Sequence, residues 1–274
     1  PPEVPAPDKA TRAVVDWIAS RSKWARTRAR RHVLDYWCAR LGSEHPVLEL
    51  PLDHPRPAVQ SYRGARRRIS LDCALLADLK ALAQRQDVTL FVLLLASFQA
   101  LLHRYSGQSE IRVGVPIANR NRLETERLLG FFVNTQVLQA QVQGQMGFDQ
   151  LLAQVKQRAL EAQAHQDLPF EQLVQALQPQ RSLSYNPLFQ VMFNHQERLH
   201  AGPPHLPGLA LQPLDWAGHT TQFDLNLETQ ESASGLWASL TYATDLFDAA
   251  SIDRLAEQWQ NLLRAVVDDA AQAV

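Results

Sequence analysis

Three histidines in the second half of the chain are regularly spaced and so raise the question of a metal site. His195, His200 and His205 follow one another at five-residue steps around a glycine and two prolines. Steps of five residues place side chains neither on one face of a helix nor on one face of a strand. A zinc site needs ligands that converge. We therefore interpret these residues as loop histidines and expect no metal site.

A histidine and an aspartate stand close together at His165 and Asp167, and a carboxylate that orients an imidazole is a common general base. However, Asp167 directly precedes a segment in which Pro169 suits a first helical turn and Glu171 suits the positive end of a helix dipole. We interpret Asp167 as a helix-capping residue. The sequence also lacks the nucleophile elbow, the phosphate-binding loop, the dinucleotide fingerprint and the HExxH zinc motif, which argues against most simple enzyme classes.

The balance of charges restricts the possible partners. The 274 residues include 27 basic and 28 acidic side chains, a formal net charge of -1, which excludes a strongly basic nucleic-acid-binding chain. A basic run at 21–31 contains no acidic residue, and we interpret it as a solvated helix face or a surface for an acidic partner domain. The two cysteines, Cys38 and Cys73, do not form a CxxC pair, which indicates the reducing cytoplasm.

No membrane span is expected, because the longest apolar run, at 90–96, is too short to cross a bilayer. Hydrophobic periodicity predicts helices at 10–41, 72–86, 89–105, 148–165, 170–177 and 249–267, and strands at 61–71, 110–117, 131–142, 188–194, 209–216, 222–229 and 236–243. The helix at 89–105 is apolar almost all round and should be buried. Long early crossovers and hairpin-like spacing later predict an α/β fold, one mixed β-sheet covered by helices.

Five segments resemble, in the same order, motifs of nonribosomal peptide synthetase condensation domains. They are VGVPIANR at 113–120, LGFFVNT at 129–135, HQDLPFEQL at 165–173, RSLSYNPLFQVMF at 181–193 and LTYATDLF at 240–247. The resemblance extends from about residue 14 to residue 267. It implies a chloramphenicol acetyltransferase-like two-layer lobe, one of two lobes that face each other across a tunnel.

In the family that the chain resembles, donor and acceptor groups enter the tunnel on phosphopantetheine arms, and the acceptor amine attacks the donor thioester to form an amide. Catalysis centres on an HHxxxDG motif in the N-terminal lobe, and no two histidines are adjacent here. The chain therefore resembles the C-terminal lobe, and we expect it to contain no catalytic residue and to be inactive alone. The expected organisation is a linker or cut edge at 1–13, a lobe-connecting helix and extended connector at 14–60, and the C-terminal lobe, with floor-loop and latch-like segments, at 61–274.

The resemblance also suggests residues that line the substrate tunnel. These are Gly114, Pro116, Asn119 and Asn186, the first three of which would let the pantetheine arm pass. Reasoning from the residue alone favours a different role for Asn186, because an asparagine before a proline is restricted to extended or turn geometry and can hydrogen-bond the local backbone. Both roles for Asn186 remain open at this stage.

The resemblance further implies partners. We expect the N-terminal condensation lobe, donor and acceptor peptidyl carrier domains and an adjacent adenylation domain, with phosphopantetheine arms as substrates rather than as a bound cofactor. Segments 194–196 and 219–225 resemble condensation domains that accept a D-configured donor, or dual condensation/epimerisation domains. One alternative is a non-catalytic docking or scaffold module for carrier or neighbouring domains. Another, a homotrimeric acetyltransferase, would need a catalytic histidine near the C-terminus, and the tail at 268–274 has none.

Overall fold

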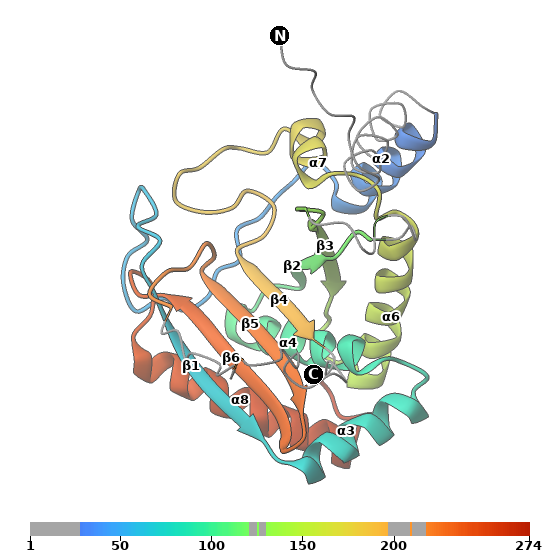
Figure 1. The fold of residues 1–274 in the computed structure, drawn as a ribbon, viewed down its shortest axis with the longest axis vertical. Coiled ribbons are helices and arrows are strands. Elements are labelled where there is room, and N and C mark those ends of the chain that lie inside the picture. Colours follow the sequence, from blue (N-terminus) through green and yellow to red (C-terminus); the bar gives the residue numbers. More distant parts are fainter. Residues whose placement is uncertain (1–27, 121–124, 126–129, 197–208, 210–217) are drawn as a thin grey trace. The chain divides into compact units, whose positions relative to one another are not determined.

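The computed structural model describes residues 28–120, 125, 130–196, 209 and 218–274 (Figure 1). The chain divides into two compact units. Unit 1 consists of Pro1–His45, Pro116–Gln136 and Glu161–Pro179, and unit 2 consists of Pro46–Val115, Val137–Leu160 and Gln180–Val274. The domain boundaries expected at residues 13 and 60 stay a prediction.

A six-stranded mixed sheet forms the centre of unit 2, with the ends of two strands continuing into unit 1. Its strand order is β1-β6-β5-β4-β2-β3. The strands are β1 (Gly64–Leu71), β2 (Glu110–Ile117), β3 (Asn134–Gln141), β4 (Val191–Gln196), β5 (Leu225–Ser232) and β6 (Gly235–Ala243). β6 pairs antiparallel with β1 and β5, whereas β4 runs parallel to β5 and β2. The mixed sheet that the element order predicted is therefore confirmed.

Three helices of unit 2 pack against the sheet and one another: α3 (Cys73–Arg85), α4 (Leu90–Ser106) and α8 (Ala249–Asp268). In Figure 1, α8 runs behind β1 and β6, and α3 lies beyond the ends of the strands. Every residue of α4 from Val92 to Leu102 is buried, as its apolar surface predicted. In this core the indole nitrogen of Trp259 donates to the hydroxyl of Ser97 at 3.0 Å, so the polar atom of a buried aromatic side chain is satisfied.

The ends of α4 follow from local sequence. The Thr89 side chain accepts a hydrogen bond from the amide of Val92, which caps the first turn. Gly107 ends the helix with φ +69°, a left-handed conformation that glycine adopts without steric cost. Among the described residues, no single helix is long and apolar enough to cross a membrane, although α3 and α4, bent by 101°, meet that length and composition test as a pair.

Unit 1 contains α2 (Arg28–Leu41), α7 (Phe170–Leu177) and the C-terminal end of α6 (Phe148–Ala164). His165, considered above as a base, is a packing residue here. Its imidazole stacks on Tyr36 with ring centroids 3.9 Å apart, and its Nδ1 lies 2.7 Å from the carbonyl oxygen of Glu161. The indole nitrogen of Trp37 donates to the carbonyl of His165. These contacts hold α2 against the segment between α6 and α7.

Asp167 does not occupy the N-cap position of the following helix, whereas Glu171 lies in the first turn of that helix, as predicted. α7 starts at Phe170, after Pro169, and Pro169 makes no side-chain capping bond. Instead, the amide of Phe170 donates to Oδ1 of Asn134 at 3.0 Å, and Nδ2 of Asn134 donates to the carbonyl of Leu168 at 2.8 Å. The side chain that caps α7 therefore belongs to Asn134 in β3, which is distant in sequence. The local sequence pattern had indicated Asp167 instead.

Four predicted strands start three residues later than expected, at 64, 134, 191 and 225 rather than at 61, 131, 188 and 222. Before the last two, side chains form turns. β4 begins at 191 rather than 188, since Oδ1 of Asn186 accepts from the amide of Leu188. β5 begins at 225 rather than 222, since the Thr221 hydroxyl bonds both the amide and the carbonyl of Phe223. The predicted strand at 209–216 lies outside the described residues apart from Leu209, as does the part of the first predicted helix before residue 28.

Candidate functional site

A pocket of about 660 Å³ opens on unit 2. Three segments form its walls, each just before a strand: 59–62 before β1, 182–186 before β4 and 220–223 before β5. Its lining residues are Val59, Gln60, Tyr62, Ser182, Leu183, Tyr185, Asn186, Thr220, Thr221, Gln222 and Phe223. We call it the connector pocket, because one wall belongs to the extended connector that precedes β1.

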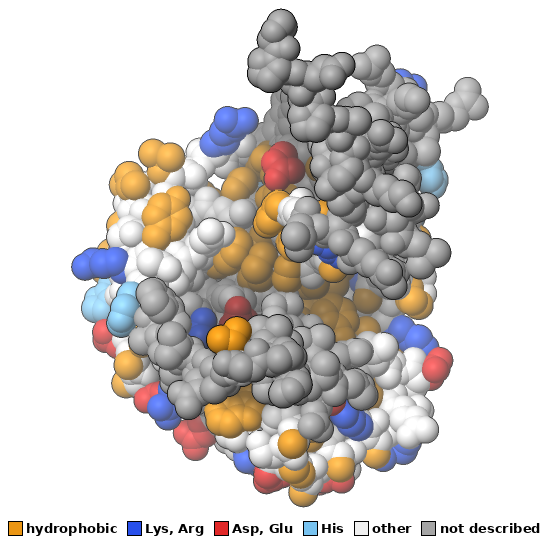
Figure 2. Space-filling view, in the orientation of Figure 1, with side chains coloured by type: hydrophobic (Ala, Val, Ile, Leu, Met, Phe, Trp, Pro, Cys, Tyr) orange, Lys and Arg blue, Asp and Glu red, His pale blue; other side chains and the backbone are white. Residues whose placement is uncertain are grey.

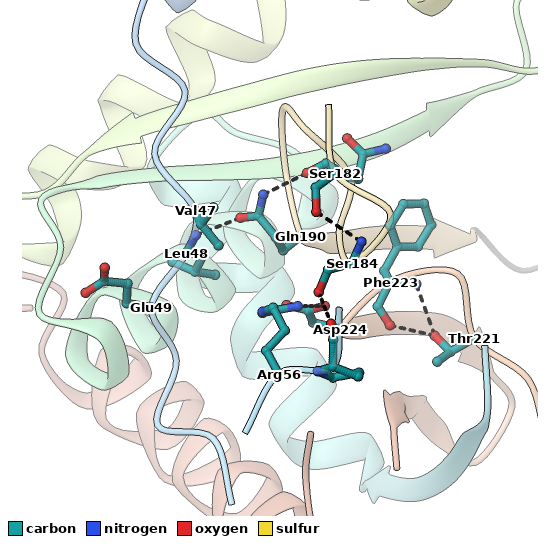
Figure 3. Close-up of polar contacts among 12 residues, drawn as sticks. Val47, Leu48, Glu49, Arg56, Ser182, Ser184, Gln190, Thr221, Phe223 and Asp224 are labelled. Carbon is teal, nitrogen blue, oxygen red and sulfur yellow. Dashed lines mark hydrogen bonds and ion pairs between the residues drawn. The ribbon is translucent and has the colours of Figure 1, made fainter. Parts of the chain in front are cut away.

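A buried glutamine ties the connector to the segment that carries Asn186 (Figure 3). The amide of Leu48 donates to Oε1 of Gln190 at 2.7 Å, and Nε2 of Gln190 donates to the carbonyl of Asn186 at 2.9 Å. Gln190 is only 2% exposed. Because both ends of its amide are bonded, this polar side chain can be buried without leaving an unpaired donor or acceptor.

An ion pair makes a second tie between the connector and the start of β5 (Figure 3). Arg56 donates through both terminal nitrogens to the two carboxylate oxygens of Asp224, at 2.9 and 2.5 Å. Asp224 is 3% exposed, and its backbone amide donates to the carbonyl of Gln190. Burial raises the pKa of the Asp224 carboxyl, and the opposing effect of Arg56 is smaller. The guanidinium also lies 5.6 Å from the ring centroid of Tyr185, a lining residue.

Backbone hydrogen bonds join the three walls directly. The Gln60 amide donates to the carbonyl of Leu183, and the Thr221 amide donates to the carbonyl of Tyr62, both at 2.9 Å. The Ser184 hydroxyl donates to the carbonyl of Pro57. The pocket is therefore built from segments that hold one another in place.

Sequence reasoning missed the residues that make these ties. Arg56 is a single arginine among prolines, and Asp224 is a single aspartate at the start of a strand, 168 positions away. Gln190 lies inside the recognised motif at 181–193, but nothing in that string marks it as a contact of the connector. A buried charge at the start of an apolar strand is a signal that a partner must exist, yet nothing local identifies that partner.

Gly114 and Asn186, expected to line the tunnel, both lie in unit 2 and both have structural roles. A Cβ on Gly114 would lie 2.2 Å from the ring of Phe189, so only glycine leaves room for that ring. Asn186 lines the connector pocket, and its Oδ1 caps the local turn by accepting from Leu188. The turn role weighed for Asn186 is confirmed, and a tunnel role stays a prediction for both residues.

Pro116 and Asn119 belong to unit 1. Asn119 has φ +53° and is 6% exposed. Its Oδ1 is buried and has no hydrogen-bond partner in the described part of the chain. Next to it, the guanidinium of Arg120 lies 4.3 Å from the ring centroid of Phe132 and donates to the carbonyl of Gly130 at 3.3 Å. Asn119 therefore presents a buried acceptor on a locally fixed segment.

The interpretation of His195 as a loop histidine is wrong, because it lies in β4, where its Nδ1 is 2.9 Å from the hydroxyl of Thr229. His200 and His205 lie outside the described residues. Across residues 28–120, 130–196 and 218–274, no group of three or more histidine, cysteine or acidic side chains gathers in a way that could hold a metal ion.

Comparison with known proteins gives one consistent family. The condensation-domain family model matches residues 3–274. One of the linear gramicidin synthase subunits of Brevibacillus parabrevis is 48% identical over 253 residues, which cover 92% of this chain and 3% of that protein. A phosphinothricin tripeptide synthetase of Streptomyces viridochromogenes is 42% identical over 242 residues, 86% of this chain and 22% of that protein. The chain spans only 3–5% of the length of the gramicidin synthase subunits that it matches.

Solved structures agree on the fold. A four-domain nonribosomal peptide synthetase bound to AMP and glycine matches with a TM-score of 0.81 and 28% identity, over 88% of this chain and 19% of that one. The X-domain from teicoplanin biosynthesis matches with a TM-score of 0.86 and 24% identity, over 100% of this chain and 62% of that one. The predicted α/β lobe, of the type found in chloramphenicol acetyltransferase, is confirmed.

Proposed function

The chain belongs to the condensation-domain family, and from this premise we propose that it is the C-terminal lobe of a nonribosomal peptide synthetase condensation domain whose parent protein forms amide bonds between carrier-bound groups. The observation that carries the proposal is the match of the family model to residues 3–274, together with 48% identity to part of a linear gramicidin synthase. The five motifs that the sequence places in family order support it.

In the proposed reaction, the acceptor amine attacks the carbonyl carbon of the donor thioester. The new C–N bond forms as the C–S bond breaks, the donor's phosphopantetheine sulfur leaves, and the proton lost by the amine neutralises that thiolate. The HHxxxDG motif of the family is absent from this chain. We therefore assign to this chain the binding and positioning of substrates, and the proton-handling groups to the N-terminal lobe. Donor and acceptor carrier domains, an adenylation domain and a cytoplasmic location belong to the same proposal.

The decisive experiment compares the chain alone with a two-lobe complex. The added N-terminal lobe is taken from the linear gramicidin synthase that is 48% identical to this chain, and we expect it to carry HHxxxDG. Size-exclusion chromatography first establishes that the two lobes coelute, and mass spectrometry then follows the carrier-bound amide product. We expect product from the complex and none from either lobe. Product from this chain alone would contradict its assignment as the non-catalytic lobe, and no product from the coeluting complex would contradict the amide-forming function.

Asn119 provides a residue-level test of a substrate role. Glycine tolerates the positive φ of this position and removes the buried, unpaired carbonyl oxygen, so Asn119→Gly should not lower the free energy of unfolding. If the Asn119 Oδ1 accepts an N–H of the substrate, the same variant should slow condensation by about tenfold, the effect of one lost hydrogen bond. Urea unfolding and the two-lobe assay measure the two effects separately. If the variant condenses at the wild-type rate, the Asn119 side chain does not bind substrate and its role is structural.

A further inference from the structure

The connector pocket concentrates exposed apolar side chains. Val59, Tyr62 and Leu183, which are 60%, 55% and 74% exposed, all line it. Figure 2 shows hydrophobic side chains gathered on the same side of the molecule, around the segment that precedes β1. Scattered single apolar residues on a surface need no explanation, whereas three in one concave site indicate a binding surface.

The polar groups of the pocket are all neutral. Gln60, Asn186 and Gln222 bring amide groups, and Ser182 and Thr220 bring hydroxyls. Among the described residues that line the pocket, none carries a charge. These groups match a ligand that has apolar carbon together with an amide, because amides and hydroxyls both donate and accept hydrogen bonds.

One pair of charges that borders the pocket is already satisfied. Arg56, which lies over the ring of Tyr185, donates two hydrogen bonds to Asp224, and that carboxylate is 3% exposed. The pair therefore offers no free counter-charge to a ligand. A charged group that entered the pocket beside this pair would lose water without gaining an opposite charge from it.

The walls are also preformed. Tyr62 is held at φ +61°, a conformation that non-glycine residues rarely adopt, and its carbonyl accepts from the amide of Thr221. The bond between Gln60 and Leu183 fixes the opposite side. A volume of about 660 Å³ lies within the range of small-molecule sites, and a preformed site binds with little ordering of its own loops.

We propose that the connector pocket binds an uncharged, apolar side chain together with its flanking amide, and that it discriminates against charged side chains. The identification of the natural ligand as an aminoacyl or peptidyl group rests on the proposed function, whereas the binding preference itself rests on the pocket. Val59, Tyr62 and Leu183 would then be specificity-determining residues.

The test is a titration of the ¹⁵N-labelled chain, followed by NMR, with three probes: the methylamides of N-acetyl-leucine, N-acetyl-glutamate and N-acetyl-lysine. We expect the leucine probe to cause saturable shifts at 59–62, 182–186 and 220–223, and both charged probes to bind at least about tenfold more weakly. Pantetheine, which contains amides but no amino-acid side chain, is the comparator. Leu183→Asp should weaken binding of the leucine probe, and Val59→Asp is a second variant with the same expectation.

Leu160→Asp is the matched control, because Leu160 is also exposed, at 53%, but does not line the pocket. Equal binding of the leucine and charged probes, tighter binding of pantetheine than of the leucine probe, or an equal loss in Leu183→Asp and Leu160→Asp would each overturn the proposal. So would an absence of saturable shifts, which would leave the patch as a surface for a neighbouring domain. The titration uses this chain without an N-terminal lobe. Its result therefore does not depend on whether the two-lobe complex forms an amide.

Discussion

Asp224→Ala will lower the free energy of unfolding by about 3–5 kcal/mol, because it leaves the partly buried guanidinium of Arg56 without its partner. Arg56 contacts both carboxylate oxygens, and the side chains of Arg56 and Asp224 are 18% and 4% exposed. Urea denaturation of the chain and the variant measures the difference. The loss should also loosen the connector, which Arg56 ties to the start of β5.

Two further variants separate the destabilisation caused by an unpaired charge from the stabilisation that the Arg56–Asp224 pair itself provides. Asp253→Ala removes the carboxylate of an ion pair with Arg67 whose side chains are both about half exposed, and it should cost about 0–1 kcal/mol. The double variant Arg56→Met/Asp224→Leu should recover most of the stability lost in Asp224→Ala, since apolar side chains of similar size need no desolvation of charge. A double variant as unstable as the single one would show that the pair is itself strongly stabilising.

The pH dependence of stability reports on the same carboxyl. Burial raises the pKa of Asp224 above its ordinary value of 3.8, and Arg56 lowers it by less. The native state therefore holds the proton more tightly than the unfolded chain does. The resulting stabilisation is complete below pH 3.8 and is lost as the pH rises through the native pKa. The stability of the wild-type chain relative to Asp224→Asn should fall over that range, and a flat difference would contradict a raised pKa.

Gly114→Ala will destabilise the chain by about 1–3 kcal/mol, because the added methyl group overlaps a buried aromatic ring. The Cβ would lie 2.2 to 2.6 Å from three ring carbons of Phe189, and Phe189 is itself packed in the core, with its ring centroid 5.4 Å from that of Phe223. The ring can move only by disturbing these neighbours. Thermal or urea unfolding measures the loss.

Gly144→Ala controls for the effect of replacing a glycine by alanine where no clash occurs, since a Cβ at Gly144 meets no atom within 4 Å. It should leave stability almost unchanged. Phe189→Leu removes part of the ring that Gly114→Ala encounters, so the two changes together should cost less than the sum of the single changes. Additive losses would mean that the clash with Phe189 is not the cause.

The sequence by itself determined most of the helices and the family. Helix α4 could be predicted because its causes are local: Thr89 caps the first turn, Gly107 ends the last, and the apolar surface between them requires burial. The five family motifs are likewise contiguous strings. The alternation that predicts strands is weaker near strand ends, where the side chains of Asn186 and Thr221 form turns that compete with pairing.

Only the tertiary structure decided what the candidate site is made of. The cap of α7 comes from Asn134 rather than from Asp167, and the carboxylate partner of Arg56 lies 168 residues away. Gly114 is required by the ring of Phe189, which reaches it from the segment before β4, and not by its own turn. The physical reason is the same in each case: these groups meet through burial against distant parts of the chain, and a buried charge or donor needs a partner wherever the fold supplies one.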